Sequence, residues 1–598
     1  MKNSNNYIKK SIKILIIYFF FNSLMSFSQT ITHGPVIGAI SDSSARIYIR
    51  SNNSANVTIE ISKQSNFSSI NSYPGIISNY NDTSTIINLS GLEDETKYYF
   101  RIKLNNVLQQ ETGSFSTFPI NGKKGNYVIL AGSGSNLYLS DSLFRIMQNQ
   151  NANIFLHYGD WTYPDTPITS PTYNDFFSYD SVEVAKSYRI RYGGFPNIKE
   201  FLKNCPIDYM YDDHDFVSND ACKNSTVYKT YDTLTHISNL YTVPFAPLAR
   251  RNAIIGYDKY FPHYPLIDTT QGIYHKFKLG NAEFFVLDLR SSRSPNFESF
   301  IYNPNAPGTN KWSFEPPPGH TMLGASQLNW LLTNLQNSTA DWKFIISTTT
   351  FNKSYDELLN LMMIFQNAGG ANSEGTGSGL TAASGFADSW AGFPSDRDSI
   401  IEFIKQKDIQ NVIVVSGDSH SSAIDDGTNS GLPEIMAANV NQINSHFVRY
   451  IDSIYTHSLW NRGGQGLGNT NYNFCFGKIE IFSDDSCRLS LVDVNDEVIT
   501  SYTIPKTYSD IKVVNNPNEI KLFPNPVENL LSIKFLKPTT INKIEIIDIS
   551  NRVVLTKEYN NSTLLNTNID IKSLKEGVYL INIFGDKFNK KDIFIKQK

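Results

Sequence analysis

Residues 154–160 read IFLHYGD and residues 412–420 read VIVVSGDSH, so two apolar runs each end in a Gly-Asp pair. Short runs of β-branched and aromatic residues that stop at a glycine are typical of buried strands. A Gly-Asp pair directly after such a strand permits a sharp turn and aims a carboxylate at the edge where strand ends meet. We therefore expect Asp160 and Asp418 to carry chemistry, together with His420.

Around these runs, apolar segments alternate with amphipathic segments across residues 125–505. Strands are expected at 127–131, 154–158, 284–289, 343–347 and 411–416, and helices at 141–149, 326–337 and 399–407. This alternation predicts an α/β layered domain, α-β-β-α, with sheets buried between helices. Its chemistry should lie on loops at the carboxyl ends of the strands.

The flanking regions have a different pattern, in which apolar and polar residues alternate at period two. Within residues 29–119 this pattern predicts an N-terminal β-sandwich, of the Fn3-like kind, with strands at 45–49, 57–61, 85–89 and 98–102. A stretch rich in Asn, Ser and Pro then precedes residues 518–598, where a second small β-sandwich is expected. The chain of 598 residues is therefore predicted to be multidomain.

The amino terminus and the charge balance bear on the compartment and on the partners. Residues 1–28 place lysines before an apolar run and small residues, which is the layout of a secretory signal peptide. No later run reaches the roughly 20 apolar residues of a membrane span, so none is expected in the mature chain. The net charge of -4 indicates no broad basic surface, and we expect no specific binding of nucleic acid.

Four cysteines are too few for a disulfide scaffold, although an exported chain permits disulfides. We expect Cys205 to pair with Cys222 and Cys475 to pair with Cys487, because each disulfide would close a short local loop. Buried thiols that form no disulfide are the alternative, since cysteine is often buried.

A second polar cluster follows the apolar residues 207–211. It consists of Asp212, Asp213, His214 and Asp215, and Asn219 and Asp220 lie shortly after it. Carboxylates placed this closely repel one another unless a cation neutralises them. The cluster therefore predicts a metal site, and a solvated acidic loop is the alternative.

Further motifs occur in a characteristic order, namely LDLRSSR at 287–293, LGASQ at 323–327 and DSWAGFP at 388–394. With the Gly-Asp elements and the acidic cluster, they resemble the alkaline phosphatase D (PhoD-like) family of the calcineurin-like metallophosphoesterase superfamily. Near the carboxyl terminus, LFPNP at 522–526 and LKEGVYL at 574–580 resemble the sorting domain of type IX secretion. That resemblance implies a secreted or cell-surface protein that is recognised by the type IX secretion machinery.

The resemblance to the phosphatase family also implies roles for individual residues. Asp160 would bridge two metal ions, and His214 would be the general acid. Tyr163, Asp213, Asp418 and His420 would be further metal ligands, and the acidic cluster adds Asp212 and Asn219 as candidate ligands. Family members hold iron and calcium, but Gly134 stands where the family has a cysteine ligand, so the identity of the ions stays open. Ser133, Ser135, Asn136 or water would then complete the ligand set.

Arg290 and Arg293 are expected to clamp a substrate phosphate, because guanidinium groups match phosphate oxygens. A structural pairing with Asp288 or a place on a solvated loop is the alternative. The predicted reaction is hydrolysis of phosphate monoesters, diesters or both, by in-line attack of a metal-bound hydroxide. Two alternatives stay open: an extracellular phosphodiesterase for nucleic-acid or teichoic-acid-like polymers, and a catalytically inert surface binding module.

Overall fold

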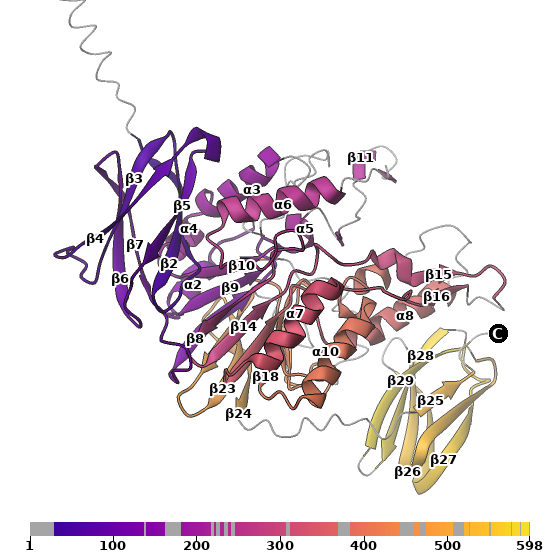
Figure 1. The fold of residues 1–598 in the computed structure, drawn as a ribbon. Coiled ribbons are helices and arrows are strands. Elements are labelled where there is room, and N and C mark those ends of the chain that lie inside the picture. The colour runs from indigo at the N-terminus through magenta and orange to yellow at the C-terminus, as the bar shows by residue number, and fades with distance from the viewer. Residues whose placement is uncertain are drawn as a thin grey trace, which may run out of the picture. The chain divides into compact units, whose positions relative to one another are not determined.

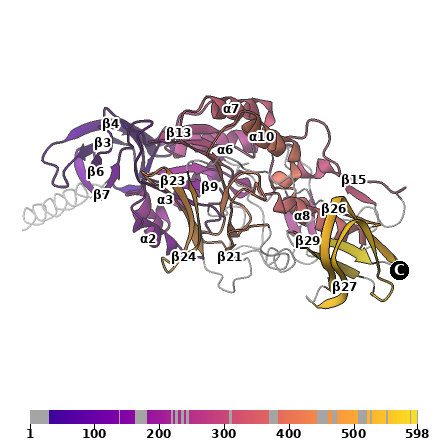
Figure 2. The ribbon, with the colours of Figure 1, turned by 90° about the horizontal axis from the view of Figure 1, so that it is seen from below.

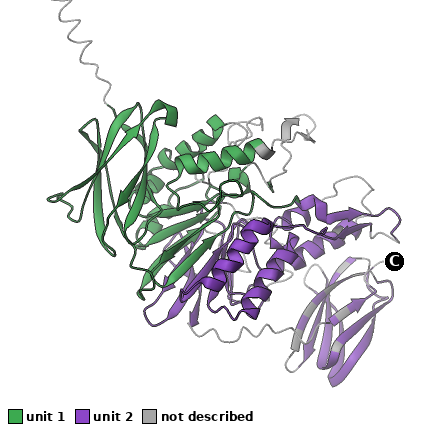
Figure 3. Ribbon diagram, viewed as in Figure 1, with its two compact units in different colours: residues 1–295 green, residues 296–598 purple. Residues whose placement is uncertain are grey.

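A computed structural model gives the fold in two compact units, Met1–Pro295 and Asn296–Lys598, which are considered separately (Figure 3). It describes residues 29–136, 139–161, 181–216, 220–222, 228–232, 237–240, 246–306, 311–368, 383–442, 459–465, 474–505, 520–524, 527–548, 552–575, 577–585 and 588–596. The predicted signal peptide, residues 1–28, lies outside these ranges. Within them, no helix is long and apolar enough to cross a membrane.

The first unit opens with antiparallel strands (Figure 1). One group consists of β1 (Ile31–Gly38), β2 (Ser44–Ser51) and β5 (Ser84–Ser90). The other has the order β4-β3-β6-β7, formed by β3 (Ala55–Ser62), β4 (Asn71–Ile77), β6 (Lys97–Leu104) and β7 (Val107–Ser116). These elements confirm the strands predicted at 45–49, 57–61, 85–89 and 98–102, and alternate side chains of β6 pack inward.

Parallel strands form the core sheet of the first unit. They are β8 (Tyr127–Gly132), β9 (Ile154–Tyr158) and β10 (Ile207–Met210). Strand β1 joins this sheet beside β10 through the parallel pair Gly38 and Ile207, so the order continues as β8-β9-β10-β1-β2-β5. The carboxyl ends of β8, β9 and β10 therefore lie at one edge of a single sheet.

Helices cover this sheet. Helices α3 (Ser181–Gly193) and α4 (Pro196–Leu202) pack against β1, and α6 (Ala246–Tyr260) packs against β5 (Figure 1). Helix α2 (Leu143–Gln148) packs against α4 and confirms the helix predicted at 141–149. The single turn α5 (Asp213–Phe216) begins just after β10 and carries the acidic cluster.

A hairpin of β13 (His275–Leu279) and β14 (Ala282–Val286) completes the described strands of the first unit, together with β11 (Tyr228–Asp232) and β12 (Ile237–Leu240). His275 Nε2 on β13 lies 3.0 Å from a carboxylate oxygen of Asp208 on β10, and both side chains are buried. This pair connects the hairpin to the core sheet. The rings of Tyr264, Phe277 and Phe284 stack beside it with centroid separations of 4.5 and 4.6 Å.

The second unit contains its own mixed sheet. Strands β17 (Trp342–Ile346), β18 (Val412–Ser416) and β20 (Glu434–Ala437) are parallel. Strand β19 (Ser422–Asp425) pairs antiparallel with β20 and with β21 (Gly464–Gln465). The helices are α7 (Gly324–Asn337), α8 (Ser354–Ala368) and α10 (Pro394–Gln406). Helix α10 begins earlier than predicted because Pro394, which needs no backbone donor, occupies its first turn.

The remaining strands of the second unit are antiparallel. They comprise β15 (Phe300–Tyr302), β16 (Trp312–Phe314), β22 (Cys475–Ile481), β23 (Ser486–Asp493) and β24 (Val498–Pro505). The last strands have their own apolar core and are β25 (Ile520–Phe523), β26 (Leu530–Asp548), β27 (Val553–Asp570), β28 (Gly577–Gly585) and β29 (Phe588–Lys596). Figure 2 shows β26 beside β27, its antiparallel partner. The protein is thus multidomain and rich in β-structure.

The predicted disulfides are wrong, because no disulfide joins the four cysteines, all of which are described and buried. In the antiparallel ladder of β22 and β23, Cys475 lies opposite Asp493 and Cys487 lies opposite Ile481. The two thiols therefore lie at opposite ends of this ladder. Six residues of strand separate them by roughly 20 Å, at about 3.3 Å per residue. Cys205 precedes β10 and Cys222 follows it, so β10 itself separates the other pair, and a disulfide requires Cα atoms within about 7 Å.

The buried Asp208–His275 pair predicts a pH-dependent stability. Burial alone would lower the pKa of His275, but the charge and hydrogen bond of Asp208 outweigh burial and raise it. The stabilisation is complete below the unfolded pKa of about 6.5 and is lost as the pH rises through the folded value. The difference in Tm between wild type and Asp208→Asn should therefore shrink from about pH 6 to about pH 9 in calorimetry. A pH-independent difference, as expected for the exposed control Asp94→Asn, would contradict the charged pair.

Candidate metal centre

The turn after β9 brings the ends of two strands into close contact. Gly159 has φ +94° and Asp160 has φ +58°, both in the left-handed region. A Cβ atom on Gly159 would lie only 2.2 Å from the Cβ atom of Asp212, which follows β10. Only glycine permits this approach, so the Gly-Asp motif places Asp160 beside the acidic cluster.

Three side chains predicted for the site come together at this point. Asp160, Asp213 and His214 each offer a donor atom, and these atoms all lie within 4.8 Å of one another. Their side chains are buried, with exposed fractions of 1%, 1% and 8%. The two carboxylates at this spacing suit a hard cation, and the imidazole beside them is a group that can bind a metal or exchange a proton. Tyr163 and Asn219, also predicted as ligands, lie outside the described residues.

Asp213 stays ionised in this buried position. Burial alone would raise its pKa, but Arg290, His214, a hydrogen bond with Asp160 and the backbone N–H of Asp220 together hold the pKa below its ordinary value. That N–H donates to Asp213 Oδ2 over 2.7 Å. A buried anion requires compensating positive charge, which the site supplies in part through an arginine.

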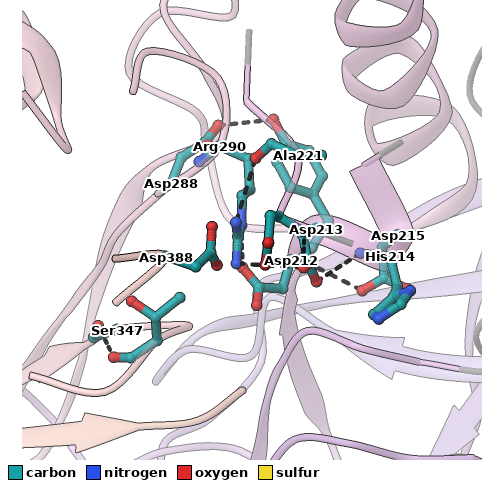
Figure 4. A network of polar contacts seen from close by, with 12 residues as sticks. Asp212, Asp213, His214, Asp215, Ala221, Asp288, Arg290, Ser347 and Asp388 are labelled. Carbon is teal, nitrogen blue, oxygen red and sulfur yellow. Dashed lines mark hydrogen bonds and ion pairs between the residues drawn. The ribbon is translucent and has the colours of Figure 1, made fainter. Parts of the chain in front are cut away.

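Arg290 faces the acidic cluster from the loop after β14 (Figure 4). Its Nε donates to Asp212 Oδ1 over 2.5 Å, and its Nη2 lies 4.0 Å from Asp213 Oδ2. Nη1 donates to the carbonyl oxygen of Ala221 over 3.3 Å. The guanidinium is therefore buried against two carboxylates of the cluster. The predicted phosphate clamp by Arg290 and by the equally buried Arg293 stays a prediction.

Asp288 organises the loop that carries Arg290. Its Oδ1 accepts hydrogen bonds from the backbone N–H groups of Arg290 and Ser291 over 3.0 and 2.9 Å. Its Oδ2 accepts from the Ile273 N–H and from the Tyr211 hydroxyl over 2.9 and 2.7 Å. Asp288 thereby fixes the backbone of the loop that carries Arg290.

The end of β8, where Gly134 replaces the family cysteine, is bound to the end of β9. The Ser135 N–H donates to the carbonyl oxygen of Asp160 over 2.8 Å, and Ser135 Oγ lies 2.8 Å from His157 Nε2. Burial and the charge of Arg191 lower the pKa of His157, so its ring is neutral. The buried Oδ1 of Asn136 finds no hydrogen-bond donor among the residues that the structure describes.

The second unit presents the other predicted ligands after β18. Asp418 and His420 are half-buried and adopt φ +68° and +52°, which are unusual for residues other than glycine. Such backbone conformations often occur at functional sites. Glu434 lies on β20, the strand that pairs with β18. Burial raises its pKa to about 8, and it accepts hydrogen bonds from Ser416 Oγ and the Phe351 N–H. No local sequence pattern indicated Glu434.

The close approach at Gly159 predicts a large effect of one methyl group. Gly122 serves as a matched control, because it has φ +84° but open space around its Cβ position. Gly122→Ala should cost roughly 1–2 kcal/mol, the strain of a left-handed residue. Gly159→Ala should cost clearly more, since its Cβ would overlap Asp212. Calorimetry of both variants measures this, and equal shifts in Tm would contradict the packing.

Comparison with known proteins identifies the family of the chain. Residues 130–449 match the model of the PhoD-like phosphatases, and residues 521–597 match the secretion system C-terminal sorting domain, which indicates secretion or export to the cell surface. Alkaline phosphatase D of Bacillus subtilis (strain 168) is 26% identical over 356 residues, which span 57% of this chain and only 53% of that protein. A solved structure of PhoD shares the fold, with a TM-score of 0.55 at 18% identity over 79% of this chain and 89% of that one. The chain belongs to the PhoD-like phosphatase family.

Proposed function

We propose that this protein is an exported phosphoesterase that hydrolyses phosphate monoesters, diesters or both with the help of bound metal ions. The observation that carries the proposal is the buried group of Asp160, Asp213 and His214, with donor atoms within 4.8 Å of one another. It lies inside the residues that match the PhoD-like phosphatases. Export would follow recognition of the sorting domain by the type IX secretion machinery.

Asp160 and Asp213 would hold the metal through carboxylate oxygens, with Asp418 and His420 as further ligands. Oxygen-rich ligands favour hard cations such as calcium or ferric iron, and no thiolate is present at Gly134. Among the candidates to replace it, the hydroxyl of Ser135 already contacts His157. We therefore favour the buried amide oxygen of Asn136 as the additional ligand.

Metal ions at such a site lower the pKa of a water molecule and neutralise negative charge on phosphate oxygens. The residues of the chain would do the rest. Arg290 would orient Asp212 and Asp213 and offset part of their negative charge, because its guanidinium contacts both carboxylates. His214 would donate a proton to the leaving oxygen, a contribution of roughly 10² to 10⁴ in rate for a well-placed acid.

We further propose that the core has the α-β-β-α layering predicted from the sequence, preceded by an Fn3-like sandwich. Burial of several charged side chains at one strand edge argues against the inert binding module, because desolvating charges is costly and a binding surface does not require it. No described residue favours a nucleic-acid or teichoic-acid-like polymer over a small ester.

Graded substitutions test the metal site. Asp160→Asn should lower both bound metal and turnover at least about 100-fold, because a two-metal site depends on its shared carboxylate. Asn136→Ala should weaken metal affinity by roughly 10-fold, in line with loss of one supporting polar group. Metal content by mass spectrometry and hydrolysis of chromogenic monoesters and diesters provide the two measurements.

Asp208→Asn is the matched control, since it removes a buried carboxylate of β10 that contacts His275 instead of the site. It should retain the metal of the wild type. Full turnover and full metal content in Asp160→Asn would refute the proposal.

A further inference from the structure

Asp215 connects the two loops that carry the proposed ligands Asp160 and Asp213. Its Oδ1 accepts a hydrogen bond from the Trp161 N–H over 3.0 Å, just after β9. Its Oδ2 accepts from the Asp212 N–H over 3.2 Å, just after β10. The second contact caps the turn α5, because an acidic side chain in the first helical turn reaches back to the N-cap residue. One carboxylate thus fixes backbone groups of both loops.

Arg191 on α3 holds this carboxylate in place. Its Nη2 donates to Asp215 Oδ1 over 2.5 Å, and its Nε donates to the Trp161 carbonyl over 3.1 Å. Both side chains of the pair are 1% exposed. The guanidinium also lies 4.8 and 5.1 Å from the ring centroids of Tyr188 and Tyr209, so it has little freedom to move.

The anchored backbone groups are direct neighbours of the proposed ligands. Trp161 follows Asp160, and Asp212 precedes Asp213. A shift of either loop would therefore move a ligand, and a displacement of about 1 Å in a reacting site can cost about 100-fold in rate. Without the carboxylate, two buried N–H groups would lose their acceptor, which favours a rearranged loop.

We propose that Asp215, held by Arg191, is a positioning residue that sets the separation of Asp160 and Asp213. The proposal rests on the proposed function where it concerns catalysis, but the loop geometry can be tested without metal. Asp208 provides the matched control, because it forms a buried ion pair with His275 in the same unit and its carboxylate bonds to neither loop in the described contacts.

Hydrogen exchange of the metal-free full chain tests the loop geometry. Asp215→Asn should speed exchange of the amides of residues 159–161 and 211–213 by at least about 10-fold, whereas Asp208→Asn should leave both loops unchanged. If Asp215→Asn does not fold, Arg191→Lys serves as the second variant. It keeps the positive charge beside Asp215 but removes the Nε donor to the Trp161 carbonyl, so it should loosen the same loops to a smaller degree. Unchanged exchange in both loops would overturn the proposal.

Kinetics with chromogenic esters and calorimetric titration with Mn²⁺ test the consequence for catalysis. Asp215→Asn should lower kcat by about 100-fold and weaken Mn²⁺ binding, with a much smaller change in KM. Loosened loops with wild-type kcat and Mn²⁺ affinity would overturn the positioning role. A wild-type chain that neither binds Mn²⁺ nor hydrolyses esters would refute the proposed function instead, and the exchange result would still decide whether Asp215 fixes the loops.

Discussion

The close approach of two strand ends is the constraint on which the candidate centre depends. Parallel pairing of β9 and β10 brings the carboxyl ends together, and Gly159 lets Asp212 pack where any side chain would collide. Asp160 then points into the same region as Asp213 and His214. The site is therefore a consequence of sheet register as much as of ligand chemistry, because a shift of one residue in either strand would separate these side chains.

Burial of charge is the cost of this arrangement, and a network of arginines offsets it in part. Arg290 faces Asp212 and Asp213, while Arg191 faces Asp215. Each arginine also donates to a backbone carbonyl, so each neutralises charge and fixes a loop at once. The carboxylates of Asp160 and Asp213 lie together at this edge and form a natural place for a cation.

Much of this organisation could be predicted from the sequence. Apolar runs at 154–158 and 412–416 became buried strands, and Gly-Asp marked the turn at the end of each, because both signals are local. The cysteines were mispaired because short sequence separation says nothing of the strand between them. The role of Asp215 was missed for the same reason: its partners Trp161 and Arg191 are fixed by tertiary packing.

The most direct test of the central claim is ester hydrolysis by the purified chain before and after chelation, with metal content measured on the same samples. We expect bound metal in the untreated protein, loss of hydrolysis of phosphate monoesters and diesters on chelation, and recovery when the metal is returned. Hydrolysis that survives complete removal of metal would contradict it, as would a folded, metal-loaded chain that cleaves neither class of ester.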